Sequence, residues 1–237
     1  MPLLLSHEEV RRCVSMSDAI GAIESMCRAQ AAGSALAAER VNLKLPNVWM
    51  RLMPGALIDS GVLGYKEFHL TRVAEAAAHV RYAYHLFDYA SGELIAMMDA
   101  DYLTFMRTAA ASGAAIKRLA REKAAVLGVI GSGAEARSHL EAAAAVRPVR
   151  SARVFSRDPA RRQRFAAEMS RQLGIDIAPV DAPEKAIEGA DILLVATNTA
   201  VTGPALAARS LKNAKKGLHI NSIGSALTMS YLCVPFP

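Results

Sequence analysis

The sequence predicts an α/β protein that combines a Rossmann-type, doubly wound parallel sheet with a smaller α+β domain. After residue 125, short apolar runs alternate with helical patterns, which is the order of elements in a doubly wound sheet. A glycine-rich segment joins the first of these runs to its helix. Between residues 40 and 98, apolar residues instead recur every second position, which indicates antiparallel strands. We therefore expect two domains, at residues 1–120 and 121–237.

Two helices are expected at the N-terminus. Ser6 and Glu9 have the spacing of a capping box, which predicts a short helix over residues 6–14. A second helix is expected to open at Ser17 and to run to about residue 32, because apolar residues at helical spacing give it one buried face.

Five strands of an antiparallel meander are expected next, at residues 41–45, 48–53, 61–70, 79–88 and 93–98. Turn residues separate several of them, namely Pro46-Asn47, Pro54-Gly55 and Ser91-Gly92. An Ala-rich helix capped by Asp99 should then run to about residue 121. Asp99 and Asp101 could also form a carboxylate pair, but their position before this helix favours capping.

The second half predicts alternating strands and helices. Residues 126–130 form a continuous apolar run, as a strand buried on both faces requires. Further strands are expected at residues 151–156, 176–179, 191–196 and 217–222, with helices ending near residue 146 and covering residues 159–173 and 183–188.

The segment Gly131-Ser132-Gly133-Ala134-Glu135-Ala136 has the spacing of a dinucleotide-binding loop, and it lies between a strand and a helix. Gly131 allows the tight turn, Gly133 lets the backbone approach a pyrophosphate, and Ala136 keeps the helix close to the strand. We expect Gly131, Ser132, Gly133 and Ala134 to bind the cofactor. An ordinary glycine-rich turn is the alternative.

The end of the second parallel strand indicates which cofactor is used. An acidic residue here would bond the ribose of NAD, but the sequence has Ser156 and Arg157. A hydroxyl and a guanidinium suit the 2′-phosphate of NADP(H), which we therefore favour over NAD(H). Asp158 fits better as the cap of the next helix. Thr197 and Asn198 follow a later strand at the carboxyl edge, where they line the cofactor path or form a simple polar loop.

Composition excludes several classes of function. The net charge is +6, but the arginines gather between residues 150 and 171 on an amphipathic helix without a nucleic-acid-binding module, so we expect no nucleic-acid partner. The three cysteines lie far apart and the histidines lack metal-ligand spacing, so no metal site is expected. No apolar run is long enough to cross a membrane, and no signal peptide is evident, so we expect a soluble cytoplasmic protein.

Four motifs carry a family resemblance: GYKEFH at residues 64–69, DADYLT at 99–104, RTAAAS at 107–112 and VIGSGAEAR at 129–137. Together they resemble the ornithine cyclodeaminase/mu-crystallin family over about residues 3–225. That family pairs a Rossmann domain with a substrate-binding and dimerisation domain. Its members include ornithine cyclodeaminases, alanine dehydrogenases and reductases of cyclic imino acids such as pyrroline-2-carboxylate. The resemblance implies a homodimer acting on a small imino or amino acid with a nicotinamide cofactor.

The resemblance implies that Arg40, Lys66 and Arg107 bind the substrate carboxylate. Guanidinium groups suit that task because they hold a carboxylate in fixed geometry. Lys66 lies in mid-strand, and two nearby arginines would lower its pKa, so it could exchange a proton with the substrate nitrogen. As residues alone, all three could also be surface cations or members of ion pairs.

The sequence departs from the cyclodeaminase pattern at two positions. Arg51 stands before Met53-Pro54 where the cyclodeaminases carry an acid, and Ala226 stands where they carry a catalytic Asp. Both departures favour imine reduction or amino-acid oxidation over ornithine cyclisation with recycled NAD, which remains the alternative. Residues 229–237 lack family character, so the resemblance implies a truncated C-terminus. A catalytically inactive family member is a further alternative.

Overall fold

The computed structural model describes residues 1–72, 79–197, 206 and 208–223. The chain divides into two compact units, Met1–Arg107 and Thr108–Pro237. The division falls within the helix that follows the antiparallel strands, upstream of the boundary at residue 120 that the sequence indicates.

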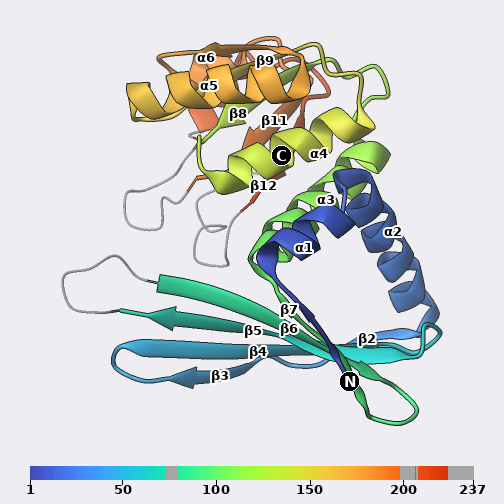
Figure 1. Cartoon of the computed structure of the whole chain (residues 1–237). Coiled ribbons are helices and arrows are strands. Elements are labelled where there is room, and N and C mark those ends of the chain that lie inside the picture. The colour runs from blue at the N-terminus through green and yellow to red at the C-terminus, as the bar shows by residue number, and fades with distance from the viewer. Residues whose placement is uncertain (73–78, 198–205, 207, 224–237) are drawn as a thin grey trace. The chain divides into compact units, whose positions relative to one another are not determined.

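The first unit is built on a seven-stranded mixed sheet with the strand order β1-β7-β6-β5-β4-β2, and β3 also pairs with β4 (Figure 1). The strands are β1 (Leu3–Leu5), β2 (Ala35–Ala37), β3 (Val41–Lys44), β4 (Val48–Leu57), β5 (Val62–Thr71), β6 (His79–Asp88) and β7 (Leu94–Asp99). The run from β3 to β7 is the expected antiparallel meander of five strands. The short strands β1 and β2 were not expected, and β1 pairs in parallel with β7.

The turn expected at Pro54-Gly55 is wrong, because both residues lie inside β4. The carbonyl of Pro54 accepts a hydrogen bond from the amide of Ala38, which lies between β2 and β3. The nitrogen and the carbonyl of one strand residue point to the same side of the strand. The proline nitrogen therefore faces the segment that separates β2 from β3. A strand tolerates proline at such a position, since no ladder hydrogen bond from its nitrogen is required.

Helices α1 (His7–Cys13) and α2 (Met16–Ala32) lie on one side of this sheet, and α3 (Asp101–Leu119) follows β7 (Figure 1). Ser6 and Glu9 form the expected capping box of α1. The expected start of α2 at Ser17 is wrong. Ser15 caps this helix and forms a second capping box with Asp18, so α2 begins about one residue earlier.

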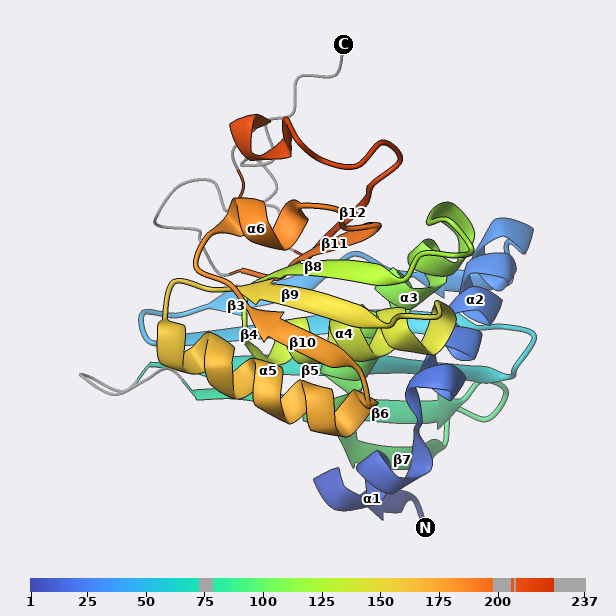
Figure 2. The ribbon, with the colours of Figure 1, turned by 90° about the horizontal axis from the view of Figure 1, so that it is seen from above.

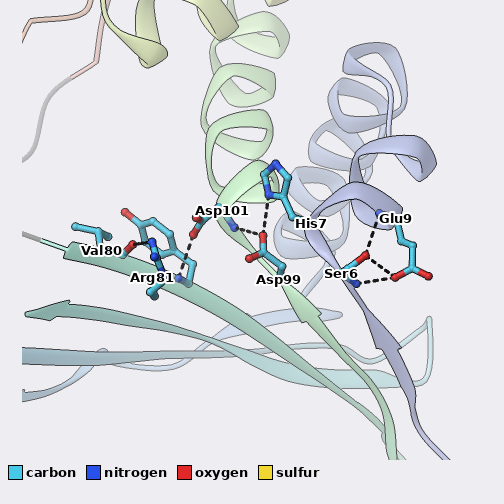
Figure 3. A network of polar contacts seen from close by, with 8 residues as sticks. Ser6, His7, Glu9, Val80, Arg81, Asp99 and Asp101 are labelled. Atoms are coloured by element: carbon cyan, nitrogen blue, oxygen red, sulfur yellow. Dashed lines mark hydrogen bonds and ion pairs between the residues drawn. The ribbon is translucent and has the colours of Figure 1, made fainter.

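Polar contacts tie the start of α3 to its neighbours (Figure 3). The amide of Asp101 donates to Asp99 Oδ1 at 3.1 Å, and His7 Nδ1 lies 3.1 Å from the same oxygen. The amide of Tyr82 on β6 donates to Asp101 Oδ1 at 3.2 Å. Asp99 and Asp101 thus act at the start of the helix, and they fix the part of α3 that carries Thr104 and Arg107.

The second unit contains a five-stranded parallel sheet with the order β10-β9-β8-β11-β12 (Figure 2). Its elements are β8 (Val126–Ile130), α4 (Ala134–Val146), β9 (Ser151–Phe155), α5 (Pro159–Leu173), β10 (Asp176–Pro179), α6 (Pro183–Ile187), β11 (Ile192–Val195), the short helix η1 (Ala208–Leu211) and β12 (His219–Ser222). One face of the sheet packs against α4 and α5, and the other packs against α6. This is the doubly wound, Rossmann-type arrangement that the sequence predicts.

Within the second unit, Arg147 binds the C-terminal end of α3. Its Nη2 donates to the carbonyls of Ile116, Lys117 and Ala120 at 2.9, 2.7 and 2.9 Å. A helix leaves its last carbonyls without partners, and its C-terminus attracts positive charge. One guanidinium therefore bonds three carbonyls at this end of the helix, of which that of Ile116 also accepts from the amide of Ala120 at 3.0 Å.

We expect Arg147→Ala to lower the free energy of unfolding by about 2–3 kcal/mol, the scale of lost hydrogen bonds to a charged group. Chemical denaturation with an unchanged m-value would measure it. Arg150→Ala is the matched control, because Arg150 is an exposed arginine three residues away. Equal effects of the two substitutions would contradict this role for Arg147.

Among the residues that the structure describes, no helix combines the length and the apolar character that crossing a membrane requires.

Candidate active site and cofactor loop

Lys66 lies near the middle of β5, on the face of the sheet that carries Met53 and Tyr84 on the neighbouring strands. Its Nζ donates to Thr104 Oγ1 of α3 at 3.2 Å. The same nitrogen lies 4.9 Å from the centre of the Tyr82 ring, a distance at which a cation is attracted to the aromatic face. A strand, a helix and an aromatic ring thus hold this ammonium group in place.

A cavity of about 540 Å³ opens beside Lys66. It is lined by residues of α2, β4, β5, β6 and α3 and of the segments that precede α2 and α3, and most of the lining side chains are apolar. The charged side chains in the lining are Asp18, Lys66 and Arg107. A mostly apolar cavity with a few convergent polar groups is typical of a small-molecule site.

Burial and neighbouring charges lower the pKa of Lys66 to about 8. Burial is the largest cause, followed by the positive charges of Arg107, Arg40 and Arg51. The sequence predicts that the pKa of Lys66 is lowered and that Arg40 and Arg107 contribute to this. It does not predict the contributions of burial and of Arg51. An amine with a pKa near neutrality can both donate and accept a proton under ordinary conditions.

The expected carboxylate ligands occupy different places around this cavity. Arg107 is exposed on α3 and lines the cavity with Lys66. Arg40 is exposed in the segment between β2 and β3 and is not among the lining residues, although its charge acts on Lys66. The structure therefore brings Lys66 and Arg107 to one cavity, with Arg40 near enough to influence the lysine.

Sequence reasoning missed the residues that position Lys66. Thr104 precedes Arg107 by one helical turn, so both lie on one face of α3. Tyr82 and Tyr84 alternate on β6, opposite Phe68 and Lys66 of β5. The period of two in the expected meander could have indicated the tyrosines, once the register of the hairpin was known.

The glycine loop follows β8 in the second unit. Gly131 has a φ of 120°, a backbone conformation that favours glycine. A Cβ atom at this position would lie 2.2 Å from the carbonyl oxygen of Ala196. The amide of Gly131 donates to the carbonyl of Phe155 at 2.8 Å, which joins the loop to the end of β9. Only glycine fits this turn.

Gly133 is the N-cap residue of α4, and as a glycine it has no side chain to bond the first amides of this helix. A Cβ atom on Gly133 would meet nothing within 4 Å, so the backbone is open on that side. Ala134 begins the helix, and Ala136 is fully buried against the sheet. Free amides at a helix N-terminus bind phosphate, so the loop fits the pyrophosphate of a dinucleotide.

Ser132 and Ser156 meet beside this loop. Ser132 Oγ donates to Ser156 Oγ at 3.0 Å, and Ser156 Oγ donates to the carbonyl of Asp158 at 3.2 Å. Asp158 caps α5 as expected, since its side chain accepts the amide of Arg161 at 3.1 Å. Arg157 is exposed, and within the described residues its side chain makes no hydrogen bond or ion pair.

Two expected cofactor residues follow β11. Thr197 lies two residues after this strand, at the carboxyl end of the parallel sheet. Asn198 lies outside the described residues.

His69 points to the opposite face of β5 from Lys66, where its Nε2 lies 3.6 Å from Glu67 Oε1. In the part of the chain that the structure describes, no cluster of three or more potential metal ligands occurs.

Comparisons with known proteins identify the family and agree with the fold. The model of the ornithine cyclodeaminase/mu-crystallin family matches residues 1–229. A Δ1-pyrroline-2-carboxylate reductase of Bacillus cereus is 34% identical over 140 residues, which are 59% of this chain and 41% of that protein. The chain thus spans less than half of that curated relative.

Two solved structures resemble the chain over most of its length. One is the Δ1-pyrroline-2-carboxylate reductase of Thermococcus litoralis in complex with NADH and L-proline, with 34% identity, a TM-score of 0.84, and coverage of 94% of this chain and 68% of that one. The other is a dimer of an archaeal alanine dehydrogenase with bound NAD, with 30% identity, a TM-score of 0.82, and coverage of 92% and 66%.

Proposed function

This chain belongs to the ornithine cyclodeaminase/mu-crystallin family, and we propose that it is an NAD(P)H-dependent oxidoreductase of a small cyclic imino acid or amino acid, such as pyrroline-2-carboxylate. The observation that carries this proposal is the half-buried Lys66, whose pKa is lowered to about 8 and which lines one cavity with Arg107. An apolar cavity with fixed cations suits a small substrate that carries a carboxylate. Substrate-dependent oxidation of NADPH by the purified chain tests it.

In this proposal Arg107 and Lys66 bind the substrate carboxylate, and Arg40 adds a third positive charge. Lys66 also donates a proton to the nitrogen of the imine as it is reduced, and it accepts a proton when an amine is oxidised. Thr104 orients the ammonium group through its hydrogen bond. The apolar lining limits the access of water to the imine, which water would otherwise hydrolyse.

Residues of the second unit hold the cofactor in this proposal. Gly131, Ser132, Gly133 and Ala134 bind the pyrophosphate through the backbone amides at the start of α4. Thr197 and Asn198, which follow β11 in the sequence, contribute to the same site. The nicotinamide ring, when bound, supplies or accepts a hydride ion.

Two features weigh against the cyclisation of ornithine. Arg51 adds positive charge near Lys66. A substrate that carries a second ammonium group would be repelled there. Ala226 replaces the acid of the cyclodeaminases and lies outside the described residues.

We also propose that the protein acts as a homodimer, which the dimer of the archaeal alanine dehydrogenase supports. Light scattering of the purified chain would show twice the mass of one chain. A single-chain mass across the tested concentrations would contradict it.

We expect the chain to bind NADPH at least about tenfold more tightly than NADH, because Arg157 is free to bond a 2′-phosphate and the carboxylate of Asp158 is engaged in capping α5. Titration that follows cofactor fluorescence measures both affinities. Arg157→Ser should bring them close together. Arg161→Ser is the matched control, since Arg161 is an exposed neighbour already paired with Asp158 at 3.4 Å. Tighter binding of NADH, or equal effects of the two substitutions, would refute the preference.

A further inference from the structure

Arg51 lies on the same face of the sheet as Lys66. It pairs with Phe68 across β4 and β5, and Phe68 is two residues from Lys66 on β5. Opposed residues of antiparallel strands, and residues two apart on one strand, share a face. Arg51 is also near enough for its charge to act on Lys66. The sequence marks this arginine only as a departure from the cyclodeaminase pattern.

The guanidinium of Arg51 is held in a fixed position. It lies 4.5 Å from the centre of the Trp49 ring, and its Nε donates to Asn42 Oδ1 at 2.8 Å. Asn42 Oδ1 also accepts from Trp49 Nε1 at 3.1 Å, so the three side chains form one unit. A stacked arginine whose Nε is engaged has lost much of its freedom before any ligand binds.

The other two nitrogens of this guanidinium remain available. Within the described residues, neither terminal nitrogen of Arg51 has a hydrogen-bond or ion-pair partner. Asp18, the acidic side chain in the lining of the cavity, accepts bonds from Ser15 in the capping box of α2. A planar pair of N–H donors on a fixed guanidinium matches the geometry of a carboxylate.

We propose that Arg51 binds a second acidic group of the substrate, so that this site takes an α-imino or α-amino acid with a carboxylate side chain. This inference rests on the proposed function, in which Lys66 and Arg107 bind the first carboxylate. Arg51 then determines specificity, because it attracts a second negative charge on the substrate and repels a positive one.

Trp49 provides a direct signal for the test, because it is the only tryptophan of the chain and stacks against Arg51. The purified chain is titrated with succinate and with its monoamide succinamate, at constant ionic strength, while tryptophan fluorescence is followed. The two probes have nearly the same shape and differ by one negative charge. We expect succinate to bind at least about tenfold more tightly, the effect of a charge-assisted pair of hydrogen bonds.

Arg51→Gln should bring the two affinities to within about twofold, since it removes the charge. Arg51→Lys should keep part of the difference. Lys44→Gln is the matched control, because Lys44 Nζ lies 5.4 Å from the centre of the same ring, on β3. It should leave the ratio unchanged. Equal affinities in the unaltered chain, or a ratio that survives Arg51→Gln, would overturn the inference.

These binding measurements involve no redox step, so they separate the two proposals. Oxidation of NADPH with a monocarboxylic imine, together with equal binding of succinate and succinamate, would leave the proposed function standing and remove the second carboxylate. Preferential binding of succinate without any cofactor oxidation would support the role of Arg51 and contradict the oxidoreductase.

Discussion

Lys66→Met is expected to lower kcat/KM for imine reduction by about a hundredfold or more, the usual contribution of a positioned general acid. Methionine keeps the length and the apolar character of the side chain but removes the charge and the proton. The half-buried position on β5 should tolerate it, because burial already disfavours the ammonium form. Steady-state kinetics with the purified variant measure this loss.

The pH dependence should identify the same group. Lys66 has a pKa of about 8, so it is protonated below that pH and neutral above it. The value of kcat/KM for imine reduction should therefore fall as the pH rises through about 8. Amino-acid oxidation needs a base instead and should increase over the same interval. Lys66→Arg should remove this inflection, because arginine stays protonated throughout.

Lys44→Met is the control for these kinetics, as it removes an exposed lysine from β3 of the same sheet. It should leave the pH profile of imine reduction unchanged. Reduction that survives Lys66→Met at the unaltered rate, with the same inflection, would remove Lys66 from the mechanism.

Gly131→Ala is expected to have the second large effect, on both folding and cofactor binding. Alanine strains a backbone with a φ of 120°, and its Cβ would lie 2.2 Å from the carbonyl oxygen of Ala196. The turn between β8 and α4 must therefore shift. We expect the variant to lose about 2 kcal/mol or more of stability, the scale of a strained residue, and to bind cofactor at least about a hundredfold more weakly.

Gly133→Ala is the matched comparison, because this substitution should weaken cofactor binding without lowering the stability of the protein. Its φ of −87° suits any residue, and an added Cβ meets no protein atom within 4 Å. Thermal unfolding should therefore be nearly unchanged, whereas the methyl group obstructs the approach of a pyrophosphate and weakens cofactor binding. Unchanged cofactor affinity in Gly133→Ala would contradict the assignment of this loop.

The sequence predicts the second unit well because its signals are local. Each strand there is a short apolar run, and the helices that follow β8 and β9 begin with a glycine loop and with the cap Asp158. The first unit depends more on pairing between distant segments. The three-residue strands β1 and β2 have no periodicity to detect, and Pro54 is accommodated only because it faces the break between β2 and β3.

In the candidate site, too, some residues are indicated by local motifs and others only by the pairing of distant segments. Lys66 and Arg107 are indicated by motifs that each lie within a few residues. The contact of Lys66 with Thr104 joins residues 38 positions apart, and Arg51 reaches the lysine only through the register of β4 and β5. No pattern along the chain specifies such a register without the fold. For this reason the sequence indicates Arg51 only as a departure from the cyclodeaminase pattern and not as part of the site.

The loss of NADPH absorbance in the presence of pyrroline-2-carboxylate, or of an imine with a carboxylate side chain, tests the central claim most directly. The purified chain should oxidise NADPH only when the imine is present, and Lys66→Met should abolish most of this activity while still binding the cofactor. If the folded chain binds NADPH and NADH yet oxidises neither with any of these imines, it is not the reductase proposed here.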